Sequence, residues 1–164
     1  MGRIKRRVRQ AGVYYVTAKT WQRRPVFAKA VPAKILLEQI LDCRQRGFYK
    51  LHAFVIMPEH FHALLTPSGD TTLEKSMQMI KGGAAYKIRK QLDYKLPIWQ
   101  PAYHDRWIRD AEEYRTRKRY IELNPVIARL VERARDYALS SANGKFVLDP
   151  SPFEAVGTSG AKAP

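Results

Sequence analysis

His60 and His62 are the residues whose type and spacing most directly indicate chemistry. They lie two positions apart within residues 57–65, a run that otherwise has the composition of a buried strand. Side chains at i and i+2 of a strand project from the same face, so both imidazoles can be directed to one point while Phe61 packs behind them. Such a pair is half of a metal site. The spacing is equally compatible with two strand histidines that face water or bond to backbone carbonyls.

Residues 110–125 contain a second candidate group. Acidic residues at the start and Pro125 as a stop predict a helix over this range. Tyr120 and Asn124 are four residues apart, so they lie one turn apart on a common helix face, with Arg117 beside them. A phenol and an amide therefore point the same way. A helix tyrosine alone more often serves packing than catalysis, but its combination with a strand pair of histidines is much rarer.

Together these residues resemble the single-tyrosine transposases of the His-hydrophobic-His nuclease superfamily, most closely the REP-associated tyrosine transposases of bacteria. The resemblance extends from about Tyr14 to Ala142 and rests on five blocks in register: residues 57–65, Ile80-Lys81-Gly82-Gly83, Ile98-Trp99-Gln100, residues 103–110 and residues 120–125. The sequence departs from the family pattern at Glu59, where Asn is usual, at Ala102, where Gly is common, and at residues 138–139, where an aromatic is usual. None of these departures affects the four residues with a predicted chemical role.

The resemblance implies a site built from both segments. His60 and His62 would bind a divalent ion, with the Asn124 side-chain oxygen as third protein ligand, and open coordination positions would remain for substrate. Tyr120 would be the nucleophile. The resemblance favours Mg²⁺ or Mn²⁺, although the ligand types would also accept Zn²⁺. His104 is a possible accessory residue.

The implied activity is that of a metal-dependent single-stranded DNA endonuclease and strand transferase. It would act at hairpin-forming, REP-like repeats through a 5′-phosphotyrosine intermediate, as a monomer or homodimer. Because a phenol in water ionises only near pH 10, a metal ion or Arg117 and Arg119 would have to favour the attacking anion. Two alternatives are a non-catalytic nucleic-acid-binding module on the same fold and a replication or conjugation nickase. The chain has no room for the helicase domain expected of the latter.

The charge of the chain supports a nucleic-acid partner. Its 164 residues include 30 Lys and Arg against 15 Asp and Glu, which gives a formal charge of +15 and a pI near 10.1. The basic residues are interleaved with aromatics rather than set opposite an apolar helix face. The predicted DNA-binding residues are Arg3, Lys5, Arg6, Arg7, Arg9, Lys81, Arg106, Arg109, Arg115, Arg117 and Arg119.

Cysteine content and hydrophobic pattern predict a cytoplasmic location, with association to the nucleoid when bound to DNA. Cys43 has no second cysteine to pair with and is predicted to be a small buried thiol in a helix. The basic residues 1–10 are not followed by an apolar segment long enough for a signal peptide. No apolar run is long enough to span a bilayer.

The remaining pattern predicts the elements that position these residues. Strands are expected at 12–18, 48–57, around 60–65 and at 103–108, and helices at 31–46, from Thr71 or Thr72 onward, and at 110–125. Gly82 and Gly83 within a helix suggest close approach of another backbone or a ligand. The order of elements indicates an α+β fold, a ferredoxin-like or RRM-like antiparallel sheet with helices mainly on one face. The expected organisation is a basic arm (1–11), one transposase domain (12–144) and a flexible tail (145–164).

Overall fold

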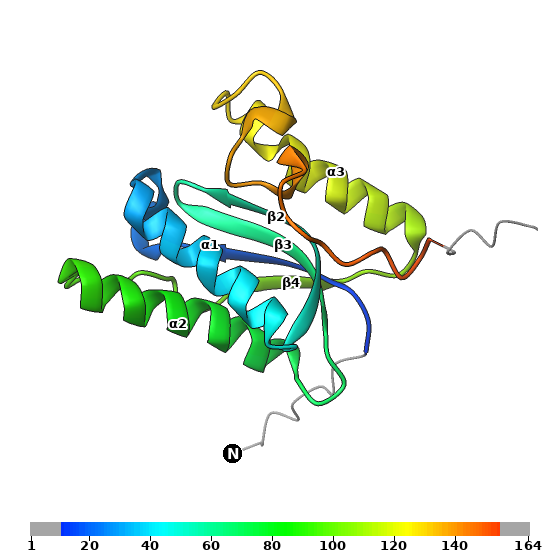
Figure 1. The fold of residues 1–164 in the computed structure, drawn as a ribbon, viewed down its shortest axis with the longest axis horizontal. Coiled ribbons are helices and arrows are strands. Elements are labelled where there is room, and N and C mark those ends of the chain that lie inside the picture. Colours follow the sequence, from blue (N-terminus) through cyan, green and yellow to red (C-terminus); the bar gives the residue numbers. More distant parts are fainter. Residues whose placement is uncertain (1–10, 155–164) are drawn as a thin grey trace, which may run out of the picture.

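The computed structural model describes residues 11–154, and its centre is a four-stranded antiparallel sheet in the order β2-β3-β1-β4. The strands are β1 (Tyr14–Lys19), β2 (Tyr49–Met57), β3 (His60–Pro67) and β4 (His104–Trp107). The helices α1 (Ala30–Gln45) and α2 (Leu73–Leu92) cover one face, and α3 (Ala111–Ile127) lies on the other (Figure 1). Up to β4 this is the ferredoxin-like arrangement, so the α+β fold predicted from the sequence is confirmed.

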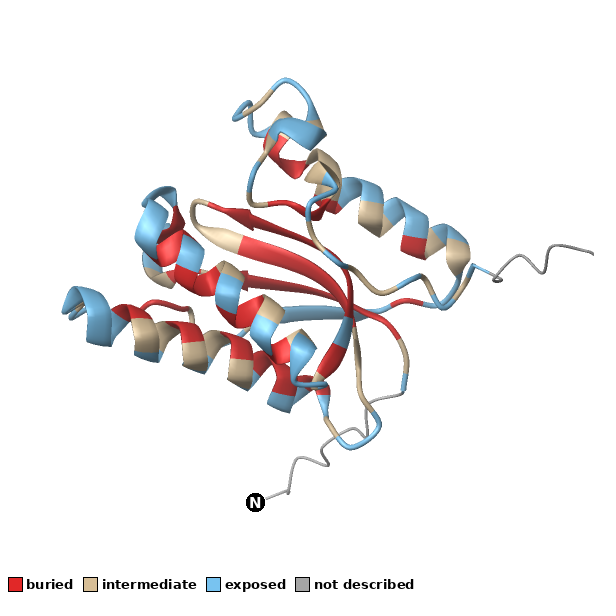
Figure 2. Ribbon diagram, in the orientation of Figure 1, coloured by how far each residue is buried: buried red, intermediate tan, exposed pale blue. Residues whose placement is uncertain are grey.

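The two faces of the sheet follow from strand alternation. Along β3, Phe61, Ala63 and Leu65 pack into the larger core beneath α1 and α2. Leu64 points to the opposite side, into a smaller core that includes Tyr114 and Ile121 of α3. Figure 2 shows buried residues along the central strands and on the inward sides of the helices. The even-numbered residues of β3, which include both histidines, therefore face α3.

A bulge in β2 gives His52 a structural role. The pairing of β2 with β3 shifts between Leu51 and Ala53, which leaves His52 as the extra residue. His52 is buried, and its ring nitrogens bond to the Thr66 Oγ1 atom at 2.8 Å and to the Asp149 carbonyl oxygen at 3.1 Å. Both ring nitrogens of His52 are therefore engaged in hydrogen bonds that lie away from the candidate site.

Helix α3 continues past the predicted stop at Pro125 and ends at Ile127. The expectation of a stop at Pro125 was wrong: the lost N–H and the clash of the ring with the preceding turn are tolerated here, two residues before the helix ends. The Asn124 and Pro125 carbonyl oxygens still accept bonds from Ala128 N at 3.0 Å and Leu130 N at 2.9 Å. The helix face that carries Asn124 is thereby kept regular to its end.

Gly83 is required for a different reason from the one expected. A Cβ atom at this position would lie 2.1 Å from Gln39 Nε2 of α1, so a side chain, not a backbone or a ligand, makes the close approach. Gly82 faces open space. Gln39 also donates to the Met79 carbonyl at 2.8 Å and accepts from Lys87 Nζ at 2.7 Å, which ties α1 to α2. Cys43 is a buried free thiol, as predicted.

Residues 145–154 pack on the domain, whereas a flexible tail was expected from residue 145. Asp149 accepts bonds from Arg44 at 2.8 and 3.0 Å and from Leu51 N at 2.8 Å, and Asp149 N bonds to the Leu51 carbonyl at 2.8 Å. Phe153 packs beside Tyr114 with ring centroids 5.7 Å apart. The composition of this segment resembles a linker, but these specific contacts order it. Residues 1–10 and 155–164, the rest of the predicted arm and tail, lie outside the described residues.

Within residues 11–154, no helix combines the length and the apolar character that a bilayer crossing demands.

Candidate active site

His60 and His62 come together on the face of β3 that α3 covers. Their ring centroids are 4.6 Å apart and the rings are inclined at 68°. Both side chains are largely shielded from solvent, since His62 is buried and His60 is partly buried. The convergence predicted from the i, i+2 spacing is thus present in the fold.

Two hydroxyl groups of β1 hold the His62 ring. Nδ1 of His62 lies 2.7 Å from Thr17 Oγ1 and 2.9 Å from the Tyr15 hydroxyl, and Tyr15 also stacks on the ring at 5.4 Å. The antiparallel register places Thr17 directly opposite His62. If Nδ1–H donates to either hydroxyl oxygen, the Nε2 lone pair is left for a ligand. Such support of a histidine through its other nitrogen is typical of metal-binding imidazoles.

Glu59 holds the His60 ring from the turn before β3. Its Oε1 atom lies 3.0 Å from His60 Nδ1 and 3.4 Å from Arg23 Nη2. A carboxylate on Nδ1 orients the ring and directs Nε2 away from the carboxylate. The residue that departs from the family pattern therefore supports the candidate site directly.

Both imidazoles are held in the neutral form that can bind a cation. Burial, together with the smaller effects of His60, Lys19 and Arg117, lowers the pKa of His62 to about 3. Burial also lowers the pKa of His60, opposed by the Glu59 carboxylate and by the Asn124 side chain. The effect of Asn124 on this pKa is consistent with an amide of α3 close to the imidazole of β3.

The position of Tyr120 depends on how α3 begins. Asp110 caps the helix by accepting a bond from Glu113 N at 2.8 Å. Glu113 in turn accepts from Arg109 N at 3.0 Å and pairs with the guanidinium groups of Arg109 and of Arg106 on β4. This cluster fastens the first turn of α3 to the sheet edge, and Tyr114 and Ile121 bury the same helix against the sheet.

Tyr120 lies next to the histidine pair. Its ring centroid is 5.6 Å from that of His62 and 6.4 Å from that of Tyr15. The residue is 42% exposed, so its hydroxyl can be reached by a large substrate, whereas Asn124 one turn later is buried. Arg117, one turn earlier, places its guanidinium over the Tyr15 ring at 5.0 Å. A phenol, two imidazoles, an amide and a guanidinium thus meet at one place.

A hollow of about 320 Å³ opens at this place. It is lined by Thr17, Lys19, Arg23, His60, His62, His104 and Tyr120. A second hollow of about 260 Å³ lies between α2 and residues 97–101, away from these side chains. His60, His62 and Tyr120 therefore line one hollow together.

The predicted metal site would need a third ligand besides the two histidines. Residues 11–154 contain no cluster of three His, Cys, Asp or Glu side chains that could hold a metal ion. His60 and His62 therefore need a third protein ligand of another type, and the Asn124 oxygen can supply it. Two imidazoles and an amide oxygen suit a divalent cation.

The predicted DNA-binding residues fall into groups with different surroundings. Lys81, on α2 across the sheet from the histidines, donates to the carbonyl oxygens of Gln100 at 3.0 Å and Ala102 at 3.4 Å. These bonds hold residues 100–102 against α2. Arg106 and Arg109 pair with Glu113. Arg115, Arg117 and Arg119 lie on α3 with the nucleophile candidate. Arg3, Lys5, Arg6, Arg7 and Arg9 lie outside the described residues.

Sequence reasoning missed the β1 contribution to the site. Tyr15, Thr17 and Lys19 alternate along β1 and face the histidines, but this follows only when β1 is paired with β3 in the observed register. The i, i+2 polar pattern of Thr17 and Lys19 in an otherwise apolar strand is the signal that could have identified them. His104, predicted as a possible accessory residue, does line the hollow.

The fold and the family comparison identify a transposase. The family model described as "Transposase IS200 like" matches residues 10–124, a range that includes His60, His62, Tyr120 and Asn124. The chain belongs to this family. Its relatives include the REP-associated tyrosine transposase of Escherichia coli (strain K12), 26% identical over 151 residues that cover 83% of this chain and 87% of that protein. The solved structure of a REP-associated tyrosine transposase bound to a REP hairpin matches with a TM-score of 0.69 and 25% identity over 92% of each chain. The resemblance seen in the sequence is thereby confirmed.

Proposed function

We propose that this transposase is a metal-dependent single-stranded DNA endonuclease and strand transferase that acts at hairpin-forming repeats. The observation that carries the proposal is the 5.6 Å separation of the Tyr120 and His62 rings in one hollow, with Asn124 against His60. A phenol at that distance from a cation site can attack a phosphate held there. The hairpin substrate is supported by the related structure, whose protein is bound to a REP hairpin.

His60, His62 and Asn124 would hold Mg²⁺ or Mn²⁺. The fit rests on the donor set: both imidazoles are neutral, and each has Nδ1 engaged by a neighbouring oxygen, so Nε2 remains available. A bound divalent ion would draw charge from the non-bridging oxygens of a phosphodiester. The remaining chemistry belongs to residues of the chain.

Tyr120 would attack phosphorus through its phenolic oxygen. The new bond joins this oxygen to phosphorus, the bond from phosphorus to the 3′ oxygen breaks, and that oxygen leaves with a proton as a 3′-hydroxyl. The DNA 5′ end stays on the protein as a phosphotyrosine. Attack of a later 3′-hydroxyl on the same phosphorus reverses the step, so the phosphoester bond is kept and no ATP is consumed. Arg117 would contribute positive charge beside the attacking oxygen.

The test is a covalent adduct assay. Wild-type protein incubated with Mn²⁺ and a labelled single-stranded REP hairpin, the kind of DNA that the related protein binds, should give a slowly migrating protein–DNA band in denaturing gels. Tyr120→Phe should abolish the band and still bind the hairpin, because only the hydroxyl is removed. Tyr86→Phe is the matched control, since Tyr86 is a 63% exposed tyrosine of α2 on the other face of the sheet.

Two outcomes would contradict the proposal. An adduct of undiminished yield with Tyr120→Phe would remove this residue from the reaction. Salt-sensitive binding by wild-type protein without any adduct or cleavage would favour the alternative of a non-catalytic nucleic-acid-binding module.

A further inference from the structure

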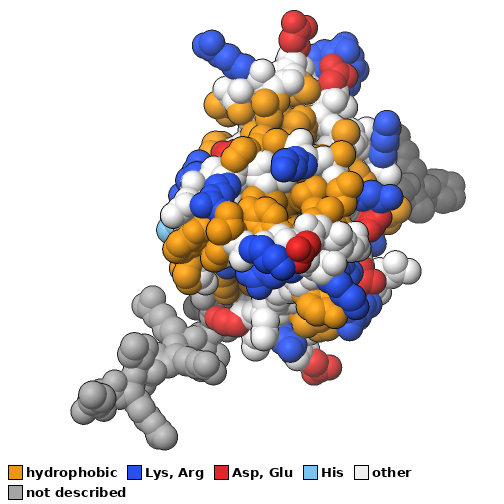
Figure 3. All heavy atoms as spheres, turned by 90° about the vertical axis from the view of Figure 1, so that its left-hand side faces the viewer, with side chains coloured by type: hydrophobic (Ala, Val, Ile, Leu, Met, Phe, Trp, Pro, Cys, Tyr) orange, Lys and Arg blue, Asp and Glu red, His pale blue; other side chains and the backbone are white. Residues whose placement is uncertain are grey.

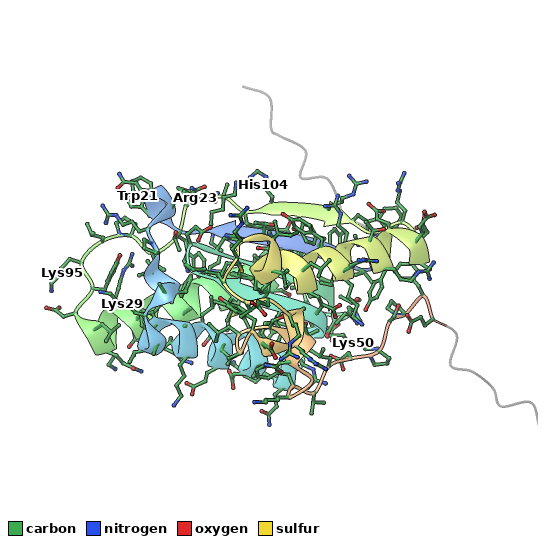
Figure 4. All side chains as sticks on the ribbon, turned by 90° about the horizontal axis from the view of Figure 1, so that it is seen from above. Trp21, Arg23, Lys29, Lys50, Lys95 and His104 are labelled. Carbon is green, nitrogen blue, oxygen red and sulfur yellow. The ribbon has the colours of Figure 1, made fainter. Side chains whose placement is uncertain are left out.

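The hollow beside Tyr120 has a basic side for which the proposed reaction has no role. Lys19, Arg23 and His104 line the hollow together with the histidine pair and Tyr120, the proposed nucleophile. Figure 4 shows Arg23 and His104 beside each other at one edge of the molecule. They come from β1, the turn after it and β4, so they are close only in the folded protein.

Strand register places Lys19 and His104 on the histidine face. Lys19 lies directly opposite His60 in the β1–β3 pair. Thr17 lies opposite His62 on one side and opposite His104 on the other. Residues paired across strands share a face, with Cβ atoms about 5 Å apart. Lys19 and His104 therefore flank the pair of candidate metal ligands.

Arg23 reaches the hollow from a tightly held turn. Gln22 and Arg23 both have positive φ values, 53° and 55°, which are uncommon outside glycine. Thr20 holds the turn, because its Oγ1 atom lies 2.8 Å from the Arg24 carbonyl oxygen and 3.0 Å from the Glu59 carbonyl oxygen, and its single O–H can donate to either. The turn therefore presents Arg23 in a defined position.

The charges on this side are largely available for an anion. Among residues 11–154, the Lys19 ammonium group has no hydrogen-bond or ion-pair partner. Arg23 contacts Glu59 at 3.4 Å through one nitrogen, and that carboxylate also bonds to His60 at 3.0 Å. Lys19 and Arg23 thus bring two full positive charges to this side of the hollow, and Glu59 brings one negative charge. Figure 3 shows that on the left-hand side of Figure 1 the Lys and Arg side chains are interspersed with hydrophobic side chains and with Asp and Glu.

We infer that Lys19, Arg23 and His104 form a subsite for a backbone phosphate of single-stranded DNA, next to the phosphodiester that Tyr120 attacks. The identification of the ligand as single-stranded DNA rests on the proposed function. A volume of about 320 Å³ lies in the lower range of ligand sites, so the hollow can hold a phosphate with part of its sugar. Occupation of this subsite would hold the DNA strand at a second phosphate, beside the candidate metal ligands.

The test measures binding of a fluorescein-labelled oligothymidylate by anisotropy in EDTA over a range of KCl concentrations. Lys19→Gln and Arg23→Gln should each raise Kd about 3- to 10-fold. Each should also reduce the salt slope, which is the steepness with which the logarithm of the binding constant falls with the logarithm of the KCl concentration, by about 0.7, the value for one lost contact to a single-strand phosphate. Lys19→Arg should restore both quantities. Lys50→Gln is the matched control, because Lys50 is an exposed strand lysine at the end of the molecule away from Arg23 (Figure 4).

The subsite is refuted if both glutamine variants show the Kd and salt slope of Lys50→Gln. Failure of the reaction is a separate result. If the adduct requires Tyr120 but the glutamine variants bind as the control does, the proposed function stands and the subsite falls. If wild-type protein forms no adduct but Lys19→Gln still reduces the slope, the subsite stands without the reaction.

Discussion

At the scale of single residues, the site depends on side chains that orient the reactive ones. Thr17 and Tyr15 contact one nitrogen of His62, and Glu59 contacts one nitrogen of His60. A buried imidazole without such a partner would lose a hydrogen bond and its fixed orientation. These positioning residues are therefore as important for the proposed metal site as the ligands.

Thr17→Val tests this role. Valine keeps the shape of threonine but removes the hydroxyl 2.7 Å from His62 Nδ1, so Mn²⁺ affinity should fall by about 10-fold or more. The measurement is titration of Mn²⁺ by electron paramagnetic resonance. Thr66→Val is the matched control, because it removes an equivalent hydroxyl, 2.8 Å from His52 Nε2, on the same sheet. Equal Mn²⁺ affinity in the two variants would show that Thr17 does not support the site.

At the scale of elements, α3 is held on the sheet by few contacts. Its buried side chains are Tyr114, Ile121, Asn124 and Pro125, and its first turn is fastened through Glu113. Since Tyr120 lies two turns after Glu113, a shift of this turn would move Tyr120, the proposed nucleophile, relative to β3. The ion-pair cluster therefore links the stability of one helix end to the geometry of the site.

Glu113 should make this attachment dependent on pH. Burial alone would raise its pKa, but the bond from Arg109 N and the Arg106 and Arg109 side chains outweigh burial and lower the pKa from 4.5 to about 2. A lowered pKa in the folded state stabilises the protein above pH 4.5, and this contribution is lost as the pH falls toward 2. Because both arginines are half exposed or more, solvent screening reduces the effect to about 1 kcal/mol.

Glu113→Gln should therefore lower the free energy of unfolding by about 1 kcal/mol near neutral pH, and the difference from wild type should shrink in acid. Urea unfolding at several pH values measures this. Glu112→Gln, an exposed carboxylate on the same turn, is the control and should change stability little at any pH. A constant difference between Glu113→Gln and wild type across the acid range would contradict the ion-pair explanation.

At the scale of the whole molecule, the two edges of the sheet differ. Residues 137–149 run along the outer edge of β2, where the Ile56 and Leu51 backbone groups bond to Leu139 and Asp149. All four residues of β4, at the opposite edge, are exposed. The last described residues thus complete the fold on the side away from the basic subsite.

Asp149→Asn tests the importance of this segment. Asp149 is bonded to both Arg44 and Leu51 N, and the Arg44 guanidinium lowers the pKa of the carboxyl against the effect of burial. Loss of the charge should reduce the free energy of unfolding by about 2 kcal/mol. The measurement is chemical denaturation, with Asp136→Asn as control, since Asp136 forms an exposed pair with Arg133. Equal stability of the two variants would show that residues 145–154 are not anchored through Asp149.

Local sequence determined much of this protein. The i, i+2 spacing of His60 and His62 and the i, i+4 spacing of Tyr120 and Asn124 specify shared faces, because strand and helix periods are local properties. Apolar alternation likewise specified the four strands and the helices to within a few residues. The extension of α3 past Pro125 and the ordering of residues 145–154 were not predicted, since both depend on neighbouring packing that has no local signature.

Tertiary structure alone decided which faces meet. Antiparallel pairing of β1 with β3 brings Thr17 and Lys19 to the histidines, and pairing with β4 adds His104, while α3 places Tyr120 over the same face. None of these contacts follows from spacing along the chain, because the partners are separated by some forty to a hundred residues and depend on strand register and on the side from which a helix packs. The sequence by itself therefore determined the reactive groups and their family, and the fold determined which groups surround them.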